Sequence, residues 1–179
     1  MNNLLTGADA QARFLLQSLK AHEGRGKLLA AETPIIEGIR LSNDPISKVK
    51  GHYESTSGEM LSLSMQHGGS KTPKWQALHI SLGEMNLSGS LLLGVLIKSR
   101  SPSSMTTKIC LRSGKDGDFQ DIFFSKTMVS FAQASVHLDV IEFDKNPNLP
   151  RQVQWRDLIL FFRPGEFDIS LLDIRLFVV

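Results

Sequence analysis

The amino-acid sequence predicts an all-β fold, an antiparallel β-sandwich preceded by a short N-terminal helical segment. From Pro34 onward, apolar side chains recur at every second position, which is typical of strands with one buried face. Runs rich in Gly, Pro, Ser and Asn separate these stretches about every 10–15 residues and indicate loops rather than connecting helices. Ahead of Pro34, one stretch has helical spacing instead.

The helical segment is expected within residues 1–26, where Gly24 and Gly26 end it. Thr6 is the expected N-cap, with Asp9 three residues later completing an acidic version of a capping box. One face of this segment carries an apolar stripe, and an apolar surface of that size is normally covered by other protein atoms. We expect the sandwich to cover the stripe, with homodimerisation through the helix as the alternative. The stripe consists of Leu5, Ala8, Ala12, Leu15, Leu16 and Leu19.

Residues 34–179 are expected to form about nine to eleven strands. The apolar run Leu91–Ile97 predicts a central strand covered on both sides. In the strand around residue 138, Val136, Leu138 and Val140 are expected to face the core, with His137 and Asp139 on the wetter side. The residues expected between the two sheets are Leu78, Ile80, Leu111, Leu138, Leu160, Ile174 and Leu176.

Length and charge narrow the class of protein. The 179 residues fit a single domain spanning 1–179, and a net charge of +2 spread along the chain does not favour nucleic-acid binding. The longest apolar stretch is too short for a membrane helix, and the N-terminus lacks the pattern of a secretory signal. With a lone cysteine, Cys110, these features lead us to expect a cytoplasmic location.

The last strand carries a family resemblance. Its sequence Leu172-Asp-Ile-Arg-Leu176 resembles the closing strand of carbohydrate-binding-module-like jelly rolls, also called galactose-binding-like domains. The resemblance implies a jelly-roll-like antiparallel sandwich of about eight or more strands. It also implies a protein without catalytic chemistry, with a glycan-binding surface on one sheet or at the loop tips.

Catalytic and metal-binding motifs are missing from the sequence. It contains no nucleophile elbow, phosphate-binding loop, zinc-protease motif or dinucleotide fingerprint, so we name no catalytic residue and expect no cofactor. Cys110 is expected to be a packed thiol. Asp116, Asp118 and Asp121 resemble a calcium loop but lack the spacing of an EF-hand, so a structural calcium involving Asp121 or Asp173 stays open.

Five residues are candidates for ligand binding. His137 and Asp139 share one face of a strand, and His79 shares a strand face with Trp75. If the two strands are neighbours, an aromatic ring would lie beside polar groups, the combination that a sugar requires. Arg112 adds a guanidinium suited to acidic groups. The alternatives are surface pairing of His137 with Asp139 and a buried Trp75.

The stretch from Trp155 is interpreted as core. Trp155 and Asp157 share one face, with Trp155 capping the core, and Arg156 points the other way and pairs with a carboxylate. The remaining aromatic residues are also expected in the core: Phe119, Phe123, Phe124, Phe161, Phe162 and Phe167.

Together these patterns predict a noncatalytic binding module whose ligand is a carbohydrate or glycoconjugate. A cytoplasmic protein-interaction or scaffold domain is the alternative. A small sandwich-fold hydrolase or lyase that uses His79 or His137 with Asp139 is a further alternative.

Overall fold

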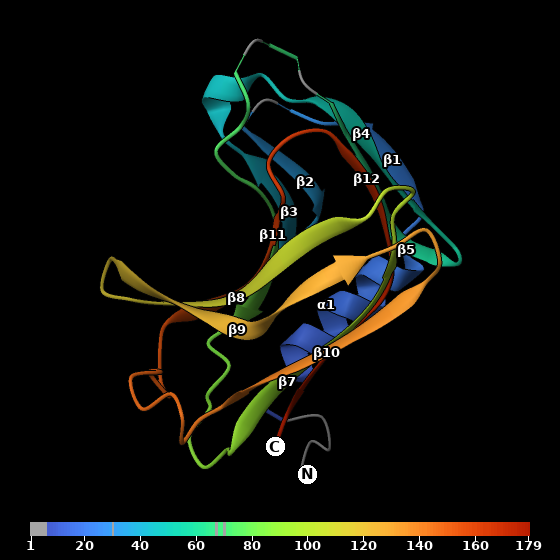
Figure 1. Ribbon diagram of the computed structural model, residues 1–179. Helices are drawn as coiled ribbons and strands as arrows, with labels where there is room; N and C mark the ends of the chain where they lie inside the picture. Colours follow the sequence, from blue (N-terminus) through green and yellow to red (C-terminus); the bar gives the residue numbers. More distant parts are fainter. Residues whose placement is uncertain (1–6, 30, 67, 70) are drawn as a thin grey trace.

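Two six-stranded antiparallel sheets face each other across one hydrophobic core (Figure 1). This computed structural model describes residues 7–29, 31–66, 68–69 and 71–179. Sheet A contains, in spatial order, β1 (Gly24–Lys27), β4 (Lys50–Thr56), β5 (Glu59–Gln66), β12 (Phe167–Val178), β7 (Leu92–Arg100) and β10 (Ser135–Glu142). Sheet B contains β2 (Glu32–Ile36), β3 (Ile39–Asn43), β6 (Gln76–Gly83), β11 (Trp155–Phe162), β8 (Met105–Lys115) and β9 (Asp118–Ser130).

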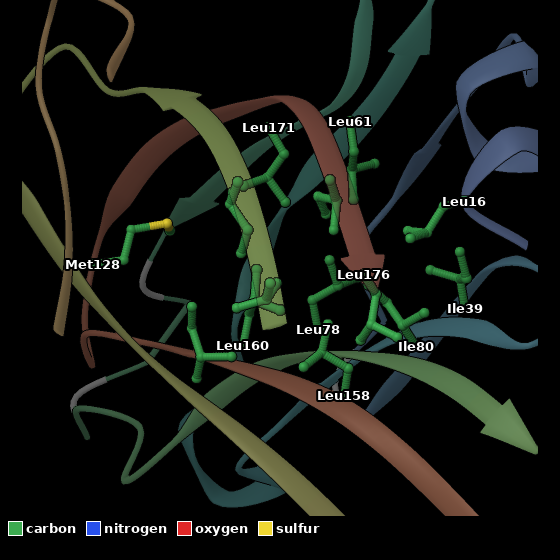
Figure 2. Packing of buried hydrophobic residues seen from close by; sticks show 14 of the residues in the cluster. Leu16, Ile39, Leu61, Leu78, Ile80, Met128, Leu158, Leu160, Leu171 and Leu176 are labelled. Atoms are coloured by element: carbon green, nitrogen blue, oxygen red, sulfur yellow. The ribbon is translucent and has the colours of Figure 1, made fainter. Parts of the chain in front are cut away.

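The fold class that the alternating pattern predicts is confirmed, and the core contains the aliphatic side chains on the inner faces of both sheets. Figure 2 shows residues from the two sheets, such as Leu61 and Leu78, pointing toward one another. The prediction that Leu138 lies in the core is wrong, because this side chain is 49% exposed. The other predicted core residues are buried: Leu78, Ile80, Leu111, Leu160, Ile174 and Leu176.

The helix α1 (Ala10–Ala21) closes one end of the sandwich. It contacts β4, β5 and β12 of sheet A and β6 of sheet B, so its apolar stripe is covered within the chain. The predicted cap Thr6 and the stripe residue Leu5 lie outside the described residues. The buried stripe residues are Ala12, Leu15, Leu16 and Leu19.

The N-terminal segment also contains a strand that the helical interpretation missed. The backbone adopts an extended conformation at His22. Residues Gly24–Lys27 then form an edge strand that pairs antiparallel with β4. At four residues with two glycines, β1 is too short to show alternation. It helps to bring the described total to twelve strands, above the predicted range. Pro34 lies in β2, an edge strand, where a residue without an N–H is tolerated.

The strand β7, predicted from its apolar run, is an interior strand between β12 and β10. Its inner face is fully buried at Leu93, Val95 and Ile97. Its outer face is not covered by a second layer, since Leu96 is only half-buried and Gly94 lies under the ring of Phe177.

The orientation predicted for β10 is reversed. Val136 and Leu138 are exposed, whereas Asp139 and Ile141 are buried. The carboxylate of Asp139 accepts hydrogen bonds from the backbone N–H of Lys126 at 2.6 Å and from the hydroxyl of Ser125 at 3.2 Å. These bonds join β10 to β9, the facing edge strand of sheet B. A buried hydrogen-bonded carboxylate has therefore taken the inner position that hydrophobicity alone assigns to leucine.

Candidate functional site

The outer face of sheet B gathers aromatic and charged side chains at alternate positions of its strands. We call it the sheet B face. Hydrogen-bond register aligns these side chains across β11, β8 and β9, the strands labelled near the centre of Figure 1. Three rows result: Trp155–Gly114–Phe119, Asp157–Arg112–Asp121 and Ile159–Cys110–Phe123.

Trp155 lies across Gly114 in the first row. A Cβ added at position 114 would overlap the indole ring, so only glycine lets the ring rest on the neighbouring strand. Trp155 is 38% exposed, which leaves part of its ring open to solvent. The sequence interpretation of Trp155 as a cap of the core is therefore wrong, although it correctly placed Trp155 and Asp157 on one face and Arg156 on the other.

Three phenylalanines assigned to the core, Phe119, Phe123 and Phe161, also lie on this face. Phe119 is 58% exposed and Phe123 is 49% exposed, whereas the adjacent Phe124 is buried. The ring centroids of Phe123 and half-buried Phe161 are 5.9 Å apart. The alternation of Phe119, Asp121 and Phe123 could have revealed this arrangement, because residues two apart share one face of a strand.

Arg112 forms a two-bond ion pair in the middle row. Its Nε and Nη2 atoms each donate to a carboxylate oxygen of Asp121 at 2.7 Å. That hydrogen-bonded pairing raises the pKa of Arg112. The guanidinium also lies 4.2 Å from the centroid of the Phe119 ring. Both groups are held in place, and their charges largely cancel.

A second polar network surrounds His79 on β6. Its Nδ1 lies 3.5 Å from a carboxylate oxygen of Asp157, and its Nε2 lies 2.7 Å from the hydroxyl of Ser42. Arg40 contacts Asp157 and Glu32, each at 3.3 Å. The middle of the sheet B face therefore offers hydrogen-bonding groups in fixed positions with little net charge.

The structure brings together three of the five predicted ligand-binding residues. Trp75, His79 and Arg112 all lie on the sheet B face, with Trp75 exposed and not buried. His137 and Asp139 do not join them, because both lie on β10, an edge strand of sheet A. No hydrogen bond joins these last two in the described residues. Burial lowers the pKa of His137, although the charge of Asp139 acts in the opposite direction.

Cys110 is packed under this face, as expected. It lies in a small buried cluster with Ala77 and Ile159, covered by Phe161. Burial raises its pKa to about 12. A thiol with that pKa is protonated at neutral pH and is a poor nucleophile.

Arg156 is buried among backbone carbonyls, and the predicted pairing with a carboxylate is wrong. Its guanidinium donates to the carbonyls of Met85 at 3.0 Å, Pro150 at 2.6 Å and Arg151 at 3.0 Å, and to the hydroxyl of Ser113 at 2.5 Å. Burial, together with the charge of Arg151, lowers the pKa of Arg156 to about 10. Arg156 fastens the loops before β7 and β11 to the body of the sandwich.

Three of the four aspartates considered for calcium, Asp116, Asp121 and Asp173, have partners within the protein. Asp116 accepts a hydrogen bond from the side chain of Gln154 at 3.0 Å, and Asp121 binds Arg112. Asp173 pairs with Lys20 and Arg175. Among the described residues, no three His, Cys, Asp or Glu side chains are grouped so that they could hold a metal ion.

Sheet A has a separate polar hollow of about 360 Å³ on its outer face. Hydroxyl and charged groups of β4, β5, β12 and β7 line it, and Arg100 at its rim forms an ion pair with Glu59. No Trp, Tyr or Phe is among its lining residues. The residues lining this hollow therefore offer no aromatic surface on which a ring could stack. The polar lining includes His52, Glu54, Ser62, Ser64, Arg100 and Ser170.

Comparison with known proteins gives similarity at the level of structure alone. No protein-family model and no curated protein matches the chain. In the part of the chain that is described, no helix is long and apolar enough to span a membrane.

Carbohydrate-binding modules are among the solved structures that share the fold. A family 4 carbohydrate-binding module has a TM-score of 0.56 at 12% identity, over 78% of this chain and 87% of that one. A family 11 carbohydrate-binding module from Clostridium thermocellum, in complex with a β-1,3-1,4-mixed-linked tetrasaccharide, has a TM-score of 0.52 at 11% identity, over 87% and 96%. Endoglucanase 3 from Trichoderma harzianum, of family GH12, has a TM-score of 0.49 at 8% identity, over 89% and 99%. The chain has the fold of a carbohydrate-binding-module-like β-sandwich.

Proposed function

We propose that this protein is a noncatalytic glycan-binding module that holds its ligand on the sheet B face. One observation carries the proposal: Trp155 lies across Gly114, in the same row as Phe119, with part of its ring open to solvent. A sugar ring has an apolar C–H face that packs against such an aromatic surface. Its hydroxyls need donors and acceptors beside the stacking ring.

The polar groups of the middle row meet that second need. Arg112 and Asp121 hold each other in place, so neither side chain loses much conformational freedom when a hydroxyl binds. Asp157 accepts a single hydrogen bond from Arg40 at 3.3 Å. The shared fold with a carbohydrate-binding module in complex with a tetrasaccharide supports the proposal.

The same pairing favours binding over hydrolysis. Glycoside hydrolysis uses two carboxyl groups on either side of the scissile bond, one of which donates a proton. On the sheet B face, Asp121 and Asp157 each lie against a guanidinium. Both carboxylates are therefore already engaged by cations within the protein.

Binding measurements on matched variants test this proposal. The native chain is screened against a broad panel of oligosaccharides, and each positive ligand is titrated by calorimetry. We expect dissociation constants from micromolar to millimolar, which correspond to binding free energies of about 4–8 kcal/mol in magnitude. Trp155→Ala is expected to weaken binding about tenfold, because the stacking surface is lost.

Phe177→Ala is the matched control, since Phe177 lies over Gly94 on sheet A as Trp155 lies over Gly114 on sheet B. It is expected to leave the affinity unchanged. Arg100→Ala serves the same purpose for the polar hollow of sheet A. The proposal fails if no glycan binds. It also fails if Trp155→Ala binds like the native chain, or if Arg100→Ala alone abolishes binding.

A further inference from the structure

A second hollow lies on the sheet B face, at the end opposite Trp155. It has a volume of about 330 Å³ and is formed where β6 and β8 begin and β11 ends. Register places Phe161 opposite Lys108, and the backbone N–H of Arg163 donates to the carbonyl of Thr106 at 3.2 Å. Its lining includes Lys74, Trp75, Lys108, Thr127, Phe161 and Arg163. We call it the basic hollow.

The charge of the basic hollow differs from that of the middle of the face. Lys74, Lys108 and Arg163 line it, and no carboxylate residue does. Arg40 and Arg112 are each in contact with an aspartate, but no such ion pair involves Lys74 or Lys108 among the described residues. Both lysines are exposed.

Asp44 is an acid in contact with Lys74, one of the residues that line the hollow. Its carboxylate accepts the backbone N–H of Lys74 at 3.0 Å and that of Ile46 at 3.1 Å. These hydrogen bonds lower the pKa of Asp44, and the nearby charge of Lys74 acts in the same direction. Asp44 therefore offsets part of one positive charge, and the hollow keeps a net positive lining.

The hollow also has aromatic walls, and β11 runs from Trp155 to the hollow along the sheet B face. Trp75 is exposed and Phe161 is half-buried, so both offer ring surface to a ligand. Trp155 and Phe161 are six residues apart on β11, which corresponds to about 20 Å of strand. Phe123, in ring contact with Phe161, lies beside this path. An oligosaccharide stacked on Trp155 and extended along β11 would reach the hollow.

We infer that the basic hollow is a subsite for a negatively charged sugar unit. This inference rests on the proposed function and specifies its ligand as an acidic glycan. The sugar ring packs against Trp75 and Phe161, and its carboxylate or sulfate accepts charge-assisted hydrogen bonds from Lys74 and Lys108. Arg163 adds a planar fork that matches either acidic group.

The experiment compares acidic and neutral oligosaccharides of the same length. The native chain, Trp155→Ala and the double variant Lys74→Gln/Lys108→Gln are titrated with three ligands: an oligogalacturonate, a neutral oligogalactose and a sulfated galactose oligomer. At low salt, the native chain is expected to bind one or both acidic ligands about tenfold more tightly than the neutral one. Which acidic ligand binds more tightly distinguishes carboxylate from sulfate.

The double variant is expected to lose the preference for acidic ligands and to keep its affinity for the neutral one. Lys98→Gln is the control, because Lys98 is an exposed lysine on sheet A. Raising the salt concentration should reduce the preference of the native chain, since the contacts are exposed to solvent. The inference is overturned if acidic and neutral ligands bind equally, or if the double variant keeps the preference. In both cases, Trp155-dependent binding of the neutral ligand would leave the proposed function standing. Failure of all three ligands to bind would count against both.

Discussion

Replacing the buried Arg156 with leucine should destabilise the fold far more than the same replacement of an exposed arginine. The side chain is fully buried, and its guanidinium serves four oxygen acceptors: the carbonyls of Met85, Pro150 and Arg151, and the hydroxyl of Ser113. Arg156→Leu fills much of the volume but supplies no donor. Each buried acceptor left without a partner costs about 1–3 kcal/mol.

The net loss is smaller than four such costs, because leucine also removes the penalty of burying a charge. That penalty is visible in the pKa of Arg156, which burial lowers to about 10. We therefore expect the free energy of unfolding to fall by about 3–5 kcal/mol, as when one partner of a buried charged pair is removed. For a chain of this size, the midpoint of thermal unfolding should fall by about 10 °C.

Urea unfolding followed by circular dichroism measures this loss. The matched control is Arg175→Leu, because the side chain of Arg175 is 70% exposed and pairs with Asp173 at the surface. That change should cost less than about 1 kcal/mol. If Arg156→Leu and Arg175→Leu unfold at the same urea concentration, the structural role given to Arg156 is wrong.

Three further results are expected. Gly114→Val should weaken glycan binding as Trp155→Ala does, because a branched side chain displaces the indole; unchanged affinity in calorimetry would contradict this. Cys110 should react with a thiol reagent at pH 8 more than about 100-fold slower in the native state than in urea, since its pKa is raised to about 12; equal rates would refute its burial. His137 should make the native state less stable as the pH falls below about 6.5, because its pKa is lowered in the folded chain and the unfolded chain binds the proton first. Between pH 7 and 5, His137→Gln should therefore lose less stability in urea unfolding than the native chain, and parallel losses would exclude the effect.

Much of the fold was predictable because burial on one face imposes a period of two. That rule correctly placed Leu78 and Ile80 in the core, and helical spacing correctly identified the buried face of α1. The resemblance in the last strand pointed to the same sandwich. The period-of-two rule failed at β10, an edge strand in which Leu138 is exposed and Asp139 is buried. The burial of Asp139 depends on its hydrogen bonds to β9, which are contacts between residues distant in the sequence.

The candidate site was only partly predictable for the same reason. Alternation correctly predicted that Trp75 and His79 lie on the same face, but it could not predict which strands are neighbours. The crossing of Trp155 over Gly114 requires β11 to pair with β8, two strands separated by β9 and β10 in the sequence. The role of Arg156 could not be predicted either, because three of its four hydrogen-bond acceptors are backbone carbonyls, which leave no trace in side-chain patterns.

Chemical-shift mapping by NMR tests the central claim most directly. A ¹⁵N-labelled native chain is titrated with the tightest-binding oligosaccharide from the panel. The indole N–H of Trp155 and the backbone amides of β8, β9 and β11 should shift with one common dissociation constant. The amides that border the polar hollow of sheet A, including those of Ser62 and Arg100, should stay in place. Shifts confined to sheet A, with the Trp155 indole unmoved, would contradict the assignment of glycan binding to the sheet B face.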